Sequence, residues 1–129
     1  LLENVHRALK PGGLFIFDTL TPKAPAAMNV PGRSWEVAGS GFWRDRPYLA
    51  LSETFHYETE NVILQQHTVC TDEGRPEVYR FWTHYYDPGT LARILAEAGF
   101  ELETVNEELL PDDGSGNHDM VSFIVARRR

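Results

Sequence analysis

The stretch Leu1–Asp18, LLENVHRALKPGGLFIFD, decides the fold of the chain. Leu2, Val5 and Leu9 recur at helical spacing with polar residues between them, which predicts an amphipathic helix. Pro11 cannot continue that helix, and the two glycines after it permit a tight exit. The run LFIF that follows has no polar member. We therefore expect a strand that is covered on both faces, as in a parallel sheet flanked by helices.

The segment Thr19–Arg46 is rich in proline, glycine and alanine. This composition predicts a loop or a short irregular excursion, which is longer than an ordinary connection and therefore a place to look for function. Three aromatic residues lie in its second half, and we expect them to pin the loop against an apolar surface: Trp35, Phe42 and Trp43.

Three β-rich runs form the middle of the chain, separated by the turn sequences ETEN and DEGRP. They predict an antiparallel meander over about Tyr48–Glu58, Val62–Thr71 and Glu77–Tyr86. Side chains alternate along a strand, so the third run divides into two faces. Because both faces carry large aromatic residues, we expect neither to be a plain solvent face. One face holds Val78, Arg80, Trp82, His84 and Tyr86, and the other holds Tyr79, Phe81, Thr83 and Tyr85.

The clearest local signal is the sequence YYDPGTLARILAEAGF. Asp87 is placed as the N-cap of a helix, with Pro88 at its first position and Gly99 as its stop. The buried stripe is expected to be Leu91, Ile94, Leu95 and Ala98. A strand ELETVNEEL, a polar turn that contains the sequence GSG (Gly114–Gly116), and a last strand MVSFIVARR complete the chain.

Composition narrows the classes of function. A length of 129 residues suits one domain, residues 1–129. The formal net charge of −7 argues against a protein that binds a nucleic-acid backbone. Cys70 is the only cysteine, so a disulfide within one chain is impossible and a reducing, cytoplasmic compartment is the simpler expectation. No apolar run approaches the roughly 20 residues of a membrane span, so no membrane partner is expected.

The order of these elements resembles the C-terminal half of class I S-adenosylmethionine-dependent methyltransferases. Two motifs carry the resemblance, LKPGG (Leu9–Gly13) and ILAEAGF (Ile94–Phe100), and it covers roughly residues 1–20 and 86–129. In that family an LKPGG-like turn leads into the fifth strand of a Rossmann-like sheet, and a last antiparallel strand inserts beside it. The resemblance implies an α/β fold, or α+β for this part alone, with residues 48–86 as an inserted β-meander that caps the substrate side.

The resemblance also implies that the parent enzyme transfers a methyl group from S-adenosylmethionine to a small-molecule acceptor. The family's cofactor residues lie in a glycine-rich turn after the first strand and at an acidic position after the second. Both precede the segment at which this chain begins, so we assign no cofactor-binding residue in it. We expect the chain alone to bind S-adenosylmethionine weakly or not at all, and to be inactive by itself.

Methyl transfer needs an oriented acceptor and, where the acceptor is protonated, a base. His84 is the candidate base, because it shares a strand face with other polar and aromatic residues. Arg80 is expected to pair either with a substrate carboxylate or with Glu53 across the sheet. We expect no metal site, because the five histidines share no ligand-like spacing. The candidate substrate-binding residues are Asp18 and Thr19, at the carboxyl end of LFIF, with Arg80, Trp82 and Tyr86.

Two hypotheses follow. The first is the C-terminal, substrate-side portion of a methyltransferase that lacks the cofactor-binding half. The second is a non-catalytic ligand-binding or interaction module built on an aromatic-lined antiparallel sheet. Under the first, the LFIF strand has an unpaired apolar edge, and such an edge invites pairing with another chain. We therefore expect self-association through this exposed edge.

Overall fold

The structure is a computed structural model that describes residues 1–107, 109–110 and 120–129. The predicted GSG turn at Gly114–Gly116 lies outside the described residues. The chain divides into two compact units, each with its own antiparallel sheet. Unit 1 comprises Leu1–Ala27 and Tyr85–Arg129, and unit 2 comprises Met28–His84.

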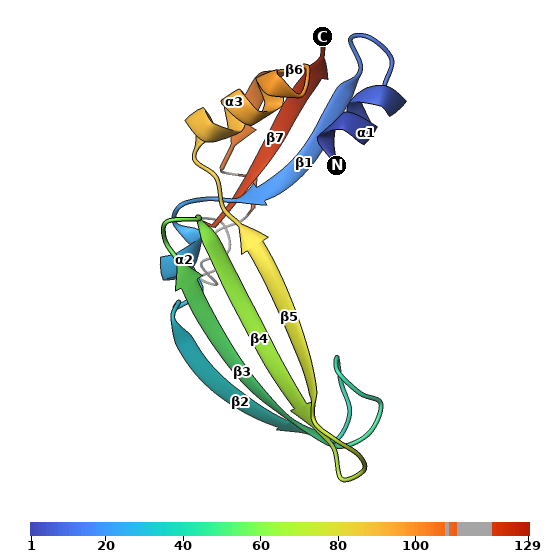
Figure 1. The fold of residues 1–129 in the computed structure, drawn as a ribbon, viewed down its shortest axis with the longest axis vertical. Helices are drawn as coiled ribbons and strands as arrows, with labels where there is room; N and C mark the ends of the chain where they lie inside the picture. The colour runs from blue at the N-terminus through green and yellow to red at the C-terminus, as the bar shows by residue number, and fades with distance from the viewer. Residues whose placement is uncertain (108, 111–119) are drawn as a thin grey trace. The chain divides into compact units, whose positions relative to one another are not determined.

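Unit 1 holds a three-stranded sheet in the order β1-β7-β6, in which the C-terminal strand lies between the other two (Figure 1). β7 pairs antiparallel with both neighbours, so β1 and β6 run in the same direction. This insertion of the last strand beside the LFIF strand confirms the expected order. The elements of unit 1 are α1 (Leu2–Ala8), β1 (Leu14–Leu20), α2 (Ala24–Ala27), α3 (Pro88–Glu97), β6 (Phe100–Asn106) and β7 (Val121–Arg128).

The LKPGG turn joins α1 to β1 as predicted. Gly12 adopts a φ of +76°, a conformation that residues with a side chain rarely take. Its N–H donates to the carbonyl oxygen of Arg128 at 3.0 Å, and the N–H of Arg128 donates to the carbonyl oxygen of Gly13 at 2.9 Å. The turn is thereby fastened to the end of β7.

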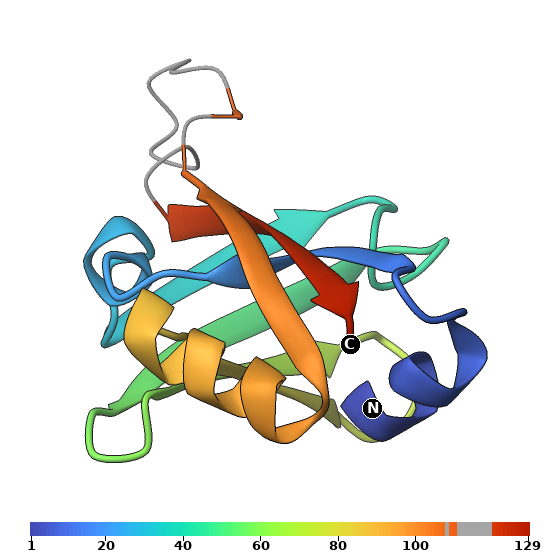
Figure 2. The same ribbon diagram turned by 90° about the horizontal axis from the view of Figure 1, so that it is seen from above.

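The core of unit 1 lies on one face of its sheet. Leu91 and Leu95 of α3 pack there against Phe100 and Ile124, and α3 runs along β6 (Figure 2). The Asp87 side chain caps α3 by accepting a hydrogen bond from the N–H of Thr90 at 2.9 Å, as predicted. Leu2, Val5 and Leu9 of α1 pack against the same cluster.

The expectation that LFIF is covered on both faces is wrong. Phe15 and Phe17 face the core, but Leu14 and Ile16 point to the other face, where the Ile16 side chain is 65% exposed. The reason is that α1 and α3 both pack on the Phe15 face of the strand, where the core cluster of unit 1 lies. An unbroken apolar run in a strand therefore does not establish that both of its faces are buried.

Unit 2 is a four-stranded antiparallel sheet in the order β2-β3-β4-β5 (Figure 1). Its strands are β2 (Gly32–Ala38), β3 (Tyr48–Tyr57), β4 (Val62–Cys70) and β5 (Glu77–His84). The last three confirm the predicted meander. The first corrects the prediction of an irregular excursion over Thr19–Arg46, because that segment contains both α2 and an edge strand that pairs along β3.

One face of this sheet is closed by the loop between β2 and β3. The indole of Trp43 stacks on Tyr79 with ring centroids 5.2 Å apart, and it packs against the small core of Tyr48, Ala50 and Val69. Trp43 thus pins the loop as expected. Trp35 and Phe42 do not, since they are 72% and 87% exposed.

Candidate functional site

The predicted substrate residues of unit 1 lie in the carboxyl-terminal half of β1. Asp18 is exposed and Thr19 is half-buried. The backbone N–H of Tyr86 donates to the carbonyl oxygen of Leu20 at 3.0 Å, next to a parallel bridge between Leu20 and Tyr85. The structure therefore brings Tyr86 to the same end of β1 as Asp18 and Thr19.

The face of unit 2 that carries Arg80 has a polar row across all four strands. Arg33, Glu53, Gln66 and Arg80 stand directly opposite one another from β2 to β5. Arg33 and Glu53 form an ion pair at 3.1 Å, and the Arg80 guanidinium donates to the Gln66 amide oxygen at 2.7 Å. The expected pairing of Arg80 with Glu53 is therefore wrong, because Gln66 on the intervening strand lies between them.

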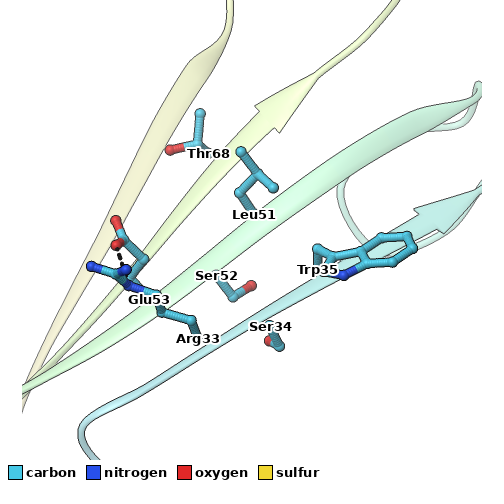
Figure 3. Close-up of a pocket in the computed structure, with 7 residues that line it drawn as sticks. All are labelled: Arg33, Ser34, Trp35, Leu51, Ser52, Glu53 and Thr68. Atoms are coloured by element: carbon cyan, nitrogen blue, oxygen red, sulfur yellow. Dashed lines mark ion pairs between the residues drawn. The ribbon is translucent and has the colours of Figure 1, made fainter.

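Large apolar side chains flank this polar row on the same face, which we call the apolar face. Strand pairing places seven exposed apolar residues on it, with exposed fractions from 37% to 72%. An open hollow of about 430 Å³ lies on this face between Trp35, Leu51 and the Arg33–Glu53 ion pair, as Figure 3 shows. The seven residues are Trp35, Val37, Leu51, Phe55, Tyr57, Val78 and Trp82.

His84 and Trp82 lie toward the C-terminal end of β5 on this apolar face. The Trp82 ring packs against Tyr57 with centroids 5.6 Å apart. On the neighbouring strand β4, Leu64 lies opposite Trp82 and Val62 lies opposite His84. His84 is exposed. The structure thus confirms that Arg80, Trp82 and His84 share one face, on which all three are exposed. Val62 and Leu64, on the same face of β4, are buried.

The opposite face of unit 2 holds a histidine in an aromatic setting. His67 shares a hydrogen bond between its Nδ1 and the Ser52 hydroxyl at 2.8 Å, and its ring lies 4.8 Å from that of Trp43. Partial burial lowers the pKa of His67, and the charge of Glu36 opposes that shift. The neutral imidazole is favoured at this position, which suits packing under the Trp43 loop.

Charged hydrogen bonds hold the Trp43 loop in place. Arg44 pairs with Glu77 and also donates to the Tyr79 hydroxyl at 2.7 Å, while Tyr79 donates to Glu77 at 2.8 Å. The bonds from Arg44 and then from Tyr79 lower the pKa of Glu77. Tyr48 donates to Glu36 at 2.7 Å, and this bond raises the pKa of the phenol. These contacts give Glu36, Tyr48, Glu77 and Tyr79 a structural role on this face.

Sequence reasoning missed the β2 half of the apolar face. Arg33, Trp35 and Val37 alternate with Ser34 and Glu36, a period of two that is a strand signal hidden among prolines and glycines. Within the described ranges, no three histidine, cysteine, aspartate or glutamate residues gather as a metal site would need. Nor is any helix of the described chain long and apolar enough to cross a membrane.

Comparison with known proteins places the fold. No protein-family model matches the sequence, and a search of curated proteins finds no significant match. Solved structures do match. The chain aligns over 99% of its length with the CcbJ methyltransferase from Streptomyces caelestis, at 21% identity and a TM-score of 0.59. It aligns over 98% with an S-adenosylmethionine-dependent methyltransferase from Clostridium acetobutylicum, at 12% identity and a TM-score of 0.62.

A third match is the sugar N-methyltransferase KedS8 from Streptoalloteichus sp., over 99% of this chain at 19% identity with a TM-score of 0.62. The chain spans about half the length of these structures, which it covers to 51%, 49% and 47%. At these identities the likeness concerns the fold. The predicted fold class, the methyltransferase-like α/β arrangement with an inserted antiparallel sheet, is confirmed.

Proposed function

We propose that this chain is the C-terminal, substrate-side part of an S-adenosylmethionine-dependent methyltransferase that acts on a small-molecule acceptor. The observation that carries the proposal is the sheet order β1-β7-β6 with a four-stranded sheet inserted between β1 and α3. That arrangement is shared over nearly the whole chain with three methyltransferase structures, and over about half of theirs.

The second face of the unit 1 sheet supports an incomplete catalytic fold. Leu14 and Ile16 are exposed there, whereas sheets of this class have helices on both faces. We propose that residues encoded upstream of Leu1 cover this face in the parent protein and supply the cofactor site. In this proposal none of the described residues binds S-adenosylmethionine.

The chain's own residues would serve the acceptor. Methyl transfer breaks the sulfur–methyl bond, returns its electron pair to sulfur and joins the methyl group to a lone pair of the acceptor, which then loses a proton. We propose His84 as the base that takes this proton. Asp18, Thr19 and Tyr86, which share one end of β1, would orient the acceptor beyond the carboxyl end of the strand.

Arg80 and Trp82 receive a narrower role than the sequence suggested. Arg80 already donates to Gln66, and Trp82 packs on Tyr57 within an exposed apolar face. We therefore propose no direct contact with the acceptor for Arg80 or Trp82. An amine on a sugar is the first acceptor class to test, because one of the matched structures is named as a sugar N-methyltransferase.

The experiment is to express the reading frame that contains this chain together with the residues encoded upstream, and to compare its product with the 129-residue chain. Calorimetry should show S-adenosylmethionine binding by the longer product only. Mass spectrometry should show methyl transfer to an amino-sugar panel, and the exchange His84→Gln should lower kcat about 10²-fold or more. A longer product without binding would contradict the proposal.

A second candidate function, a non-catalytic interaction module, is favoured by one observation. The apolar face carries seven exposed apolar residues, four of them aromatic, and exposed apolar patches often mark interaction sites. A frame without an upstream strand and glycine-rich turn would favour this alternative.

A further inference from the structure

The face of the unit 2 sheet opposite the apolar face carries a group of neutral polar side chains. Strand pairing aligns them in two neighbouring rows that cross all four strands. Neither row contains an aspartate, glutamate, lysine or arginine, although the chain as a whole has a net charge of −7. We call the eight residues of these rows the polar patch: Gly32, Thr54, Gln65 and Phe81 in one row, and Ser34, Ser52, His67 and Tyr79 in the other.

The polar patch has hydrogen-bonding capacity that the chain itself does not use. Ser52 and His67 share a hydrogen bond at 2.8 Å, which leaves the second ring nitrogen and the second lone pair of the hydroxyl. Gln65 is half-buried, and its side-chain amide has no hydrogen-bond partner in the part of the chain that the structure describes. A primary amide offers two N–H donors and one acceptor oxygen. The middle of the patch can therefore bind a ligand through several hydrogen bonds.

A hollow and an exposed aromatic ring lie at the two ends of the patch. The hollow, of about 280 Å³, adjoins β2 and β3 and is lined in part by Ser34, Ser52 and Thr54. Its size is near the lower end of ligand pockets, roughly 300 Å³, so it suits a small molecule. At the other end Phe81 is 45% exposed, and its ring centroid lies 5.8 Å from that of His67.

The spacing of the strands brings both ends within reach of one small ring. Neighbouring strands lie about 4.8 Å apart, so Gln65 on β4 is one strand spacing from Thr54 beside the hollow. It is also one strand spacing from Phe81 on β5. A ring placed over Gln65 therefore reaches the hydroxyl groups on one side and the aromatic surface on the other.

The chemistry of the patch selects the class of ligand. A charged ligand finds no opposite charge in the two rows to offset the loss of its hydration. A wholly apolar ligand would cover the amide and the hydroxyl groups without satisfying them. Hydroxyl groups both donate and accept hydrogen bonds, as the serine, threonine, glutamine and histidine side chains of the patch do. A sugar ring combines such hydroxyl groups with apolar C–H faces, which can pack on an aromatic ring.

We propose that the polar patch is a binding site for one uncharged sugar ring. Gln65 and the Ser52–His67 pair bind its hydroxyl groups, and Phe81 packs against its apolar face. The site lies on the face of the sheet opposite His84, so it is separate from the proposed acceptor site and needs no S-adenosylmethionine. Failure of either proposal leaves the other intact.

The test is saturation-transfer difference NMR of the 129-residue chain with the methyl α-D-pyranosides of glucose, galactose and mannose. We expect at least one of these sugars to bind with a dissociation constant of about 10 mM or tighter, since a small ligand on a shallow site binds weakly. Amide chemical shifts should change around Gln65 in β3, β4 and β5. Absence of saturable binding by all of these sugars up to about 100 mM would overturn the proposal, as would shift changes confined to other regions.

Two matched pairs of exchanges test the residues. Gln65→Leu removes the amide of the patch, and Gln66→Leu removes the same group from the next residue, which points to the apolar face. Phe81→Leu is matched by Phe55→Leu, because the two rings are 45% and 37% exposed on opposite faces.

The first member of each pair should raise the dissociation constant at least about fivefold, through a lost hydrogen bond or a lost ring contact. The second member should leave the dissociation constant within about twofold. Far-ultraviolet circular dichroism checks that each variant keeps its sheets. Equal effects of the two exchanges within either pair would contradict the assignment of the site to this face.

Discussion

The two units of this chain are stabilised in different ways. Unit 1 buries large aliphatic and aromatic side chains, with Leu95, Phe100 and Ile124 fully inaccessible. Unit 2 buries Tyr48, Ala50 and Val69 in one cluster, over which a loop is held by Trp43 and by charged hydrogen bonds. It also buries the consecutive β4 residues Val62, Ile63 and Leu64. The difference teaches that the unit built on the recognisable motifs is held by ordinary packing. The inserted unit instead leaves seven apolar side chains of one sheet face exposed.

The largest expected effect removes the centre of the unit 1 core. Phe100→Ala should lower the free energy of unfolding by about 3–5 kcal/mol, because it deletes a fully buried ring and leaves a cavity. Hydrogen exchange followed by mass spectrometry should show lost protection in β6 and β7. If β2 to β5 lost protection equally, the two units would be one cooperative structure and the comparison would fail.

A smaller effect is expected from the loop of unit 2. Trp43→Ala should destabilise unit 2 by roughly 2 kcal/mol, less than a fully buried tryptophan would, because Trp43 is half-buried. Phe42→Ala is the matched control. Phe42 is next to Trp43 in the chain, but it is 87% exposed, so its removal should change the free energy of unfolding by about 0.5 kcal/mol or less. Urea denaturation monitored by exchange in β3 and β4 measures both. Equal losses would show that Trp43 does not pin the loop.

The smallest expected effect is a difference between the two units in how their stability depends on pH. Burial lowers the pKa of His67 below its unfolded value near 6.5, so protons bind the unfolded chain more tightly. Stability from this group is complete above about pH 6.5 and falls as the pH drops from there through the folded pKa. The urea midpoint of unit 2 should therefore decline between about pH 7.5 and 5.5, and His67→Gln should flatten this decline.

In unit 1 the group with a shifted pKa is the Asp87 carboxyl, which titrates at a lower pH than a histidine does. Hydrogen bonds from the Thr90 hydroxyl and N–H lower the pKa of Asp87. Its contribution is present above the unfolded pKa near 3.9 and is lost as the pH falls through the folded value. The midpoint of unit 1 should stay level over the range in which unit 2 declines. His84→Gln is the control for unit 2, and a decline that it removed would point to the wrong histidine.

Local signals predicted the elements of unit 1 well. Asp87, Pro88 and Gly99 fix the ends of α3 through a cap, a preset φ and a left-handed stop, all of which act within a few residues. The order of β1, β7 and β6 came from resemblance, because pairing between distant strands has no local signature. The strands β3 to β5 followed from runs of β-forming residues between turns.

The sequence could not predict which faces of the two sheets are covered by other parts of the chain. Ile16 and Trp35 are as apolar as any core residue, and only the fold shows that both are exposed. The prediction that Arg80 pairs with Glu53 was wrong for a related reason. The register places Gln66 between the two strands, and register depends on the whole sheet. The residues of the proposed acceptor site, His84 among them, remain predictions.

The most direct measurement is isothermal calorimetry of the 129-residue chain with S-adenosylmethionine. Because we propose that the cofactor site lies outside this chain, we expect no saturable heat up to about 1 mM cofactor, the range of weak binding. Saturable binding with a dissociation constant of about 10 µM or tighter would contradict it, because the described residues would then hold a cofactor site of their own.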